Sequence, residues 1–436
     1  MNLKCVIVIF LLLTVQNIIH SQEPQIIQKR FETDYALRDT VDYIGNLYIH
    51  YPGQHPSVLT FVNNDGSVTV CASDDSAKVT WIYEFSMDLR EQKRFSIPNE
   101  YDMLGAFTKD NEGNYYIFYA RTTSVRTAEN MCTVKYSKNG EKLLTYKLIA
   151  NARNSFDGVT KPFRAGTCRM ELSGSMLAVY FARQMFNGHQ ASYGFILDKD
   201  TFERVDLGAA TNDGRMGGVS QIPYTSHSFN QFIVSIENGF LFTDHGDAYP
   251  RSFTFAKFIQ GQNTKRVHAF KFPGQTGANA TYAEMGGTAK TKEGFIFSGA
   301  YGTNANNARN VFVLTVDENM NACSNPVYIT KYTRNDGHAG HPKIVSINDG
   351  RYLILWEFFS FSTQAANLIV SERTGFLSVH AAVIDENGTL LSDIYKLDAP
   401  IRLNINDVLR CNPKNGFVYW AVNDTSNSII VYGLKY

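Results

Sequence analysis

The sequence lacks the features that mark several classes of protein. Lysine plus arginine and aspartate plus glutamate each number 41, so there is neither net charge nor a basic footprint for nucleic acid. No GxSxG, HExxH, P-loop or dinucleotide-binding fingerprint occurs. No proline-, glycine- or serine-rich linker divides the chain, and no helical hydrophobic period continues beyond about two turns. We therefore expect no nucleic-acid partner and no long helix, and no motif settles whether the protein is an enzyme.

Long apolar runs are confined to the first residues. Lys4 is followed by an apolar run over Val6–Val15, and Ser21 then offers a small residue for cleavage. The run is too short to span a bilayer, so it predicts a signal peptide over residues 1–21 in preference to an uncleaved anchor. We expect a secreted, extracellular mature chain, residues 22–436, with no membrane span after signal removal.

Cysteine is sparse and widely spaced. Five cysteines remain beyond the signal, which are Cys71, Cys132, Cys168, Cys323 and Cys411. In an oxidising compartment this odd number allows at most two disulfide bonds and leaves one thiol over. The other interpretation is that the cysteines are buried as small apolar side chains. The chain also has acceptor sequons for N-linked glycans, as expected of a secreted glycoprotein, at Asn279, Asn387 and Asn423.

Aromatic residues are abundant by contrast, and they recur in a fixed phrase. The chain has 30 Phe and 24 Tyr against 3 Trp, and aromatic and β-branched residues favour strands. A polar residue and a glycine repeatedly precede a short strand-like run, as at Glu112-Gly113 before Asn-Tyr-Tyr-Ile-Phe-Tyr. Such glycines are typical of hairpin turns. The seven turn glycines are Gly66, Gly113, Gly174, Gly239, Gly294, Gly350 and Gly416.

Each glycine turn lies between two expected strands, and a further pair of strands follows. Strands expected before the turn include Met103–Thr108, Phe229–Ile236 and Pro342–Ile347. Apolar strands that end in aspartate follow the turn at Tyr193–Asp198, Val311–Asp317 and Ala381–Asp385. Four antiparallel strands repeated in this way are the pattern of a propeller blade. We predict an all-β fold, a single β-propeller domain of about seven four-stranded blades, with six or eight as alternatives.

The chain resembles the β-propeller superfamily in the broad sense, and the blade phrase carries this likeness over nearly all of residues 22–436. No WD40, kelch or sialidase Asp-box signature accompanies it, so the resemblance implies a fold but no activity. The final strand phrase, Ile429–Tyr432, leaves little room for a fourth strand in the last blade. We expect an N-terminal segment, Tyr43–Tyr51 or Val58–Val62, to complete that blade and close the ring, which removes exposed sheet edges.

Histidines and aspartates on the loops that enter the inner strands are the candidate chemical groups. His227 and His245 are predicted to transfer protons, because the unperturbed pKa of histidine lies near neutral pH, and Asp247 to orient them. Imidazole and carboxylate groups also bind divalent metals. The predicted ligands of such a metal are His227, Asp244, His338 and His341. The alternative interpretation is that these side chains only hydrogen-bond the loop backbone.

A second set of residues is suited to recognition. Arg251 and Arg334 are predicted to hold an anionic group, and Tyr301 lies in a Tyr- and Asn-containing loop that could stack on sugars. Since recognition needs fewer specialised residues than catalysis, the first hypothesis is a secreted protein that binds an extracellular glycan or matrix protein. The second is a metal-dependent secreted enzyme, a lyase, hydrolase or oxidase, with its His/Asp site at the mouth of the channel.

Overall fold

The computed structural model describes most of residues 22–436. The described residues are 24–37, 56–150, 158–164, 166–207, 220–222, 224–248, 251–277, 281–304, 306–348, 350–361, 375–397, 401–412 and 414–436. The predicted signal peptide, the segment Tyr43–Tyr51 and the sequon residue Asn279 lie outside them. The regular secondary structure of the described residues consists of β-strands alone. The same residues contain no helix long and apolar enough to cross a membrane.

The strands form antiparallel sheets that follow the chain in order. The first sheet contains β2 (Val58–Val62), β3 (Val68–Asp74), β4 (Val79–Phe85) and β5 (Glu91–Pro98). The second contains β6 (Met103–Lys109), β7 (Tyr115–Ala120), β8 (Glu129–Tyr136) and β9 (Lys142–Ile149). An eight-stranded sheet contains β10 (Lys161–Pro162), β11 (Cys168–Ser173), β12 (Met176–Gln184), β13 (Gln190–Asp198), β14 (Ser226–Ile236), β15 (Gly239–Ala248), β16 (Ser252–Ile259) and β17 (Lys265–Lys271).

Three further sheets complete the set. One contains β18 (Ala283–Lys290), β19 (Gly294–Tyr301), β20 (Asn310–Asp317) and β21 (Val327–Tyr328). The next contains β22 (His338–Asn348), β23 (Arg351–Phe359), β24 (Phe376–Asp385) and β25 (Tyr395–Leu397). The last joins both ends of the described chain, since it contains β26 (Arg410–Cys411), β27 (Phe417–Thr425), β28 (Ser428–Lys435) and β1 (Gln25–Glu32).

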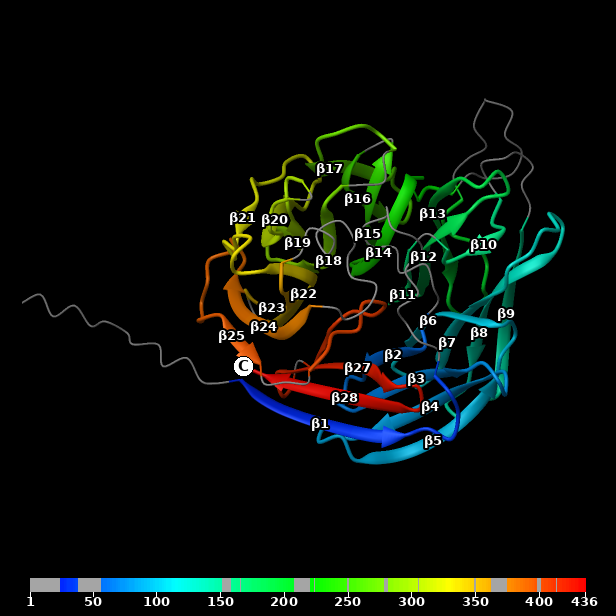
Figure 1. Ribbon diagram of the computed structural model, residues 1–436. Coiled ribbons are helices and arrows are strands. Elements are labelled where there is room, and N and C mark those ends of the chain that lie inside the picture. The colour runs from blue at the N-terminus through cyan, green and yellow to red at the C-terminus, as the bar shows by residue number, and fades with distance from the viewer. Residues whose placement is uncertain are drawn as a thin grey trace, which may run out of the picture.

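These sheets stand around a common axis, so the chain is a β-propeller (Figure 1). The strands β6, β11, β14, β18 and β22 contact one another in turn near that axis. The eight-stranded sheet is two such groups joined by a single residue pair, Ala191 with Ser226. The all-β propeller predicted from the repeated phrase is confirmed. The count of seven blades stays a prediction, because the described strands hydrogen-bond into six sheets.

The ring is closed by a strand that the sequence pattern did not reveal. β1 pairs with β28 along its whole length, from Gln25 with Lys435 to Glu32 with Ser428. The segment Val58–Val62, one of the two segments expected to close the ring, forms β2 and pairs with β3 in the first sheet, so that expectation is wrong. The alternative segment, Tyr43–Tyr51, lies outside the described residues. β1 is largely exposed, as an outermost strand with one partner is, and its apolar signal is correspondingly weak.

The glycine turns lie between strands as predicted, although the backbone reason differs between turns. Gly113, between β6 and β7, has a φ of 88°, which glycine adopts without a steric penalty. Between β14 and β15 the positive φ, 55°, falls on Asn238 instead. Gly239 is required there by space, because a Cβ would lie 2.0 Å from the carbonyl oxygen of Phe258 on β16. Both glycines therefore stabilise hairpins, one through its dihedral angle and one through close packing.

The apolar core lies between neighbouring sheets. Phe253 on β16 packs across the gap against Phe297 on β19, with ring centroids 4.8 Å apart, and both belong to one buried cluster. Full burial of such a side chain contributes about 1.5–3 kcal/mol. Aromatic strands thus hold each sheet against the next, which fixes the loops that lie at the two faces of the ring.

All five cysteines of the mature chain are described, and all are free thiols. The disulfide bonds expected from export are therefore absent from this structure, and the alternative interpretation fits. Cys71 on β3, Cys132 on β8 and Cys168 on β11 are buried in three different sheets, where they fill apolar clusters. Burial raises the pKa of each of these thiols, which keeps them protonated and unreactive.

Candidate functional site

The sequence-predicted histidines lie at one face of the ring, opposite the glycine turns. His227 is near the start of β14 and Asp247 near the end of β15, and these positions share an edge because the two strands are antiparallel. The same edge continues in the next sheets. The backbone N–H of His341, near the start of β22, donates to a carboxylate oxygen of Glu284, near the start of β18, at 2.7 Å. We call this edge of the ring the site face.

The structure brings together His227, Asp247 and Arg251. The carboxylate of Asp247 is fully buried and contacts the guanidinium of Arg251. His227 Nδ1 lies 3.9 Å from Asp247 Oδ2. His227 adopts a φ of 48°, a left-handed conformation in which a non-glycine residue stores strain, and such strain concentrates at functional sites. Burial lowers the pKa of His227, so its imidazole is neutral at pH 7 and its ring can accept as well as donate a proton.

Sequence reasoning missed a neighbour of this group, His189. Its ring lies 4.8 Å from that of His227, centroid to centroid, and its Nε2 lies 2.9 Å from Ser226 Oγ. His189 lies in the turn Asn187-Gly188-His189 between β12 and β13. The sequence signal for His189 was its position directly after a turn glycine, Gly188. This turn is not one of the seven repeated glycine turns, so the blade pattern did not include it.

His245 and Asp244 are buried on opposite sides of β15, so they do not share a site with each other. His245 Nε2 lies 2.8 Å from Thr281 Oγ1, and burial lowers the pKa of His245 to about 3. Asp244 accepts hydrogen bonds from the hydroxyls of Tyr180 at 2.7 Å and Ser228 at 2.8 Å. A fully buried imidazole with a hydroxyl partner has the geometry of a structural residue, while the proposed proton transfer by His245 stays a prediction.

His338 and His341 also have separate partners. His338 Nδ1 lies 3.1 Å from the guanidinium of Arg309, and burial lowers the pKa of His338 to about 2. His341 Nδ1 lies 2.7 Å from Glu357 Oε2. Nowhere in the described ranges do three or more His, Cys, Asp or Glu side chains form a group that could hold a metal. Ligation of a metal by His227, Asp244, His338 and His341 therefore stays a prediction without an assembled ligand set.

The recognition residues Tyr301 and Arg334 do come together, at the rim of the ring between β19 and β22. They line a cavity of about 570 Å³ with two further tyrosines, Tyr328 and Tyr332. The remaining lining residues are Gly302, Thr303, Asn307, Ala308, Asn310, Thr330, Lys331 and Thr333. We call this the Tyr301 cavity. It combines aromatic rings, amide groups and two cations, the mixture by which pockets fix polar ligands.

The tyrosines of the Tyr301 cavity differ in how firmly they are held. The hydroxyl of Tyr332 accepts from Trp356 Nε1 and lies near His380 Nδ1, both at 3.1 Å. Tyr301 is buried, whereas Tyr328 on the two-residue strand β21 is 41% exposed. The cavity therefore has two fixed aromatic walls and one ring that is open to solvent.

A buried charged cluster in the centre of the ring was not predicted from the sequence. It includes the buried residues Arg169 on β11, Lys343 on β22, Glu357 on β23 and Asp407 ahead of β26, together with the partly buried Arg410 on β26. We call it the channel cluster. Lys343 lies inside the expected strand Pro342–Ile347. A charged residue within a strand expected to lie at the axis was a usable signal, although its partners are far away in sequence.

No family model matches this chain, and a comparison with curated proteins also finds no match. Solved structures resemble it in fold at low identity. An ulvan lyase bound to a glucuronate–sulfated rhamnose saccharide is 11% identical, with a TM-score of 0.42 over 93% of this chain and 84% of that chain. A lignostilbene dioxygenase from Pseudomonas brassicacearum is 8% identical, with a TM-score of 0.41 over 81% of this chain and 74% of that one.

Other similar structures are longer than this chain. A mutant Trypanosoma rangeli sialidase with trans-sialidase activity is 11% identical, with a TM-score of 0.38 over 76% of this chain. This chain spans 57% of that sialidase and 46% of a similar prolyl endopeptidase. At these values no activity or ligand passes from those proteins to this chain.

Proposed function

We propose that the chain is a secreted, extracellular recognition protein that binds a glycan in the Tyr301 cavity. The observation that supports this most is the convergence of Tyr301, at the end of β19, and Arg334, in the loop between β21 and β22, on one cavity. Aromatic rings offer flat apolar faces to sugar rings, and amide and hydroxyl groups fix the orientation of a polar ligand. A matrix protein that presents an equivalent group is the alternative ligand.

The cations of the cavity favour an acidic glycan. Arg334 and Lys331 both line it, and the guanidinium of Arg334 lies over the ring of Phe361, 5.1 Å from its centroid. A guanidinium held on an aromatic face keeps its N–H edge available for a planar or tetrahedral oxyanion. Carboxylate and sulfate are the oxyanions that glycans carry, so a uronate or a sulfated sugar is the proposed ligand.

The test is binding of an oligosaccharide array, followed by titration of the best acidic oligosaccharide into wild type and Tyr328→Ala. Loss of the exposed ring is expected to weaken binding about tenfold while the protein stays folded. Tyr224, which is 39% exposed and lies outside the cavity, provides the matched control as Tyr224→Ala. Binding that both variants retain equally, or no glycan binding by wild type, contradicts the proposal.

The second hypothesis, a metal-dependent enzyme, has one observation in its favour, the strained His227 beside Asp247 and Arg251. Purified protein would then contain a stoichiometric transition metal, and His227→Ala would lose it. Metal analysis at background level in the wild-type protein would exclude a resident metal at these residues.

A further inference from the structure

The channel cluster contains cations whose hydrogen bonds go only to backbone carbonyls. Arg169 is 6% exposed. Its Nη1 donates to the carbonyl oxygens of Asn406 at 2.6 Å and Cys168 at 2.9 Å. Its Nε and Nη2 have no acceptor among the described residues. A buried donor without an acceptor costs free energy, so two such N–H groups on one guanidinium call for an explanation.

Lys343 on β22 likewise donates only to backbone carbonyls. It is 5% exposed, and its Nζ donates to the carbonyl oxygens of Asp407 at 2.7 Å and Ile405 at 3.4 Å. Burial, together with the charge of Arg169, lowers the pKa of Lys343 to about 7, although Asp407, Glu284 and Glu357 act in the other direction. Arg169 and Lys343 thus hold the same backbone segment from two sheets.

The carboxylates of the channel cluster are engaged by other groups. Glu171 pairs with Arg410 Nη1 at 2.5 Å, and Asp407 accepts the backbone N–H of Thr60 at 2.6 Å. Glu357 pairs with His341. Arg410 Nε, like the two atoms of Arg169, has no acceptor within the described part of the chain. Three buried guanidinium N–H groups therefore remain without an acceptor in the middle of the ring.

A cavity lies beside these groups. It has a volume of about 170 Å³ and is lined by Lys343, Arg410, Glu171 and Phe232, among others. The Arg169 guanidinium lies over the ring of Phe232, 5.0 Å from its centroid, and Phe232 is one of the residues that line the cavity. This volume far exceeds the roughly 10–15 Å³ that one water requires, so the cavity has room for a polyatomic ion.

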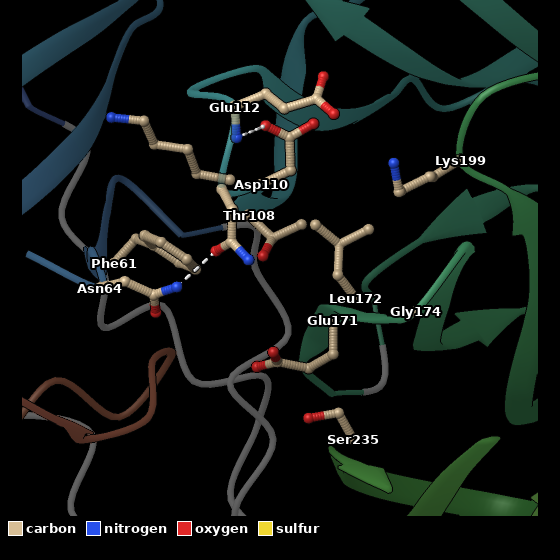
Figure 2. A pocket seen from close by; sticks show the side chains of 12 residues that line it. Phe61, Asn64, Thr108, Asp110, Glu112, Glu171, Leu172, Gly174, Lys199 and Ser235 are labelled. Carbon is tan, nitrogen blue, oxygen red and sulfur yellow. Dashed lines mark hydrogen bonds between the residues drawn. The ribbon is translucent and has the colours of Figure 1, made fainter. Parts of the chain in front are cut away.

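The cavity also has a route to solvent. Glu171 and Ser235 line both this cavity and a larger pocket of about 480 Å³ at the face that carries the glycine turns. Figure 2 shows Glu171 and Ser235 on one side of that pocket, with Asp110 and Lys199 around it. An ion can thus enter from the face opposite the site face.

We propose that the channel cavity binds a small oxyanion, a carboxylate or a sulfate group, between Arg169 and Lys343. The ion accepts from the free N–H edge of Arg169 and stabilises the protonated form of Lys343, whose pKa of about 7 leaves it partly charged at neutral pH. Among the described residues neither side chain forms a salt bridge. This site is separate from the Tyr301 cavity, so it does not depend on the proposed glycan binding.

The test is calorimetric titration of the mature protein with sodium sulfate at constant ionic strength. Arg169→Gln and Lys343→Gln are each expected to weaken sulfate binding about tenfold or more, as expected for the loss of a charged hydrogen-bond donor. The matched controls are Arg94→Gln on β5 and Lys29→Gln on β1, both exposed residues of outermost strands. Acetate is titrated in competition, because one site for both oxyanions requires that acetate displace sulfate.

Each outcome of the titration either supports or overturns the proposed anion site. Saturable binding that both channel variants weaken and both controls retain supports the site. No saturable binding by wild type, or equal binding by all four variants, overturns it. Should the channel variants not fold, wild-type crystals soaked in selenate keep the test intact. An anomalous peak beside Arg169 and Lys343 supports the proposal, and water alone, or selenate only at the molecular surface as an adventitious ion, overturns it.

Discussion

The Tyr301 cavity and the channel cluster belong to the same ring but differ in exposure and in charge. Tyr328 at the cavity is 41% exposed, whereas Lys343 in the channel is 5% exposed. An exposed ring can be removed at little cost to the fold, while a buried charge that loses its partner destabilises the folded state. Substitutions at the Tyr301 cavity are therefore expected to change ligand binding, whereas substitutions in the channel cluster are expected to change stability.

The largest effect is expected at Glu357 in the channel cluster. This carboxylate is 2% exposed, and it contacts His341 Nδ1 at 2.7 Å and the backbone N–H of Leu403 at 3.1 Å. Glu357→Gln removes the charge that pairs with His341 and Arg402. We expect the free energy of unfolding to fall by about 3 kcal/mol, measured by urea denaturation.

The control for this change is an exposed ion pair. Glu129 and Lys147 lie 2.7 Å apart with about half of each side chain exposed, and exposed pairs contribute little to stability. Glu129→Gln is expected to leave the urea midpoint nearly unchanged. Equal losses in the two variants would remove the distinction between the channel cluster and the surface.

The next effect concerns the pH dependence of stability. Burial lowers the pKa of Lys343 from 10.5 to about 7. Between pH 7 and 8.5 the unfolded chain therefore keeps a proton that the folded lysine releases, so the free energy of unfolding rises with pH. This group contributes at most about 1.4 kcal/mol per pH unit.

Lys343→Met isolates this contribution, because it removes the titrating amine and keeps an apolar chain of similar length. The slope of unfolding free energy against pH is expected to be smaller in the variant between pH 7 and 8.5, with both proteins measured in the same buffers. Parallel slopes would mean that Lys343 keeps its proton in the folded state throughout this range.

The smallest effect is expected from Arg334 at the Tyr301 cavity. Arg334→Gln should weaken the binding of an acidic oligosaccharide about threefold to tenfold, because it removes a charged donor. Binding of a neutral oligosaccharide of the same length and the thermal unfolding midpoint should stay unchanged. A similar loss for both sugars would show that charge does not determine which glycan binds.

The sequence revealed the repeated elements better than the contacts between them. β14 and β22 were predicted within a few residues from the runs Phe229–Ile236 and Pro342–Ile347, because local alternation and a turn glycine determine a hairpin. β1 was missed because an outermost strand has few buried residues. Its role depends on pairing with β28 at the other end of the chain, which no local pattern encodes.

The same division holds for the candidate site. Tyr301 and Arg334 were chosen because a segment rich in Tyr and Asn and an arginine near a predicted inner strand are visible in the sequence, and the structure places both residues at one cavity. The environment of His245 was not accessible in this way. In the sequence, Asp244 and His245 resemble a catalytic or metal-binding pair. Side chains alternate along a β-strand, however, so the two point to opposite sides of β15. Arg169 and Asn406 meet only because the ring brings β11 and the entry to β26 together.

We expect an acidic glycan to bind in the Tyr301 cavity and not in the centre of the ring. The most direct measurement is a crystal structure of the mature protein with the best acidic oligosaccharide from the array. We predict sugar density against Tyr301 and Tyr328 with an acidic group at Arg334. Density in the channel beside Lys343, or at His227 and Asp247, with the Tyr301 cavity empty, would contradict the claim.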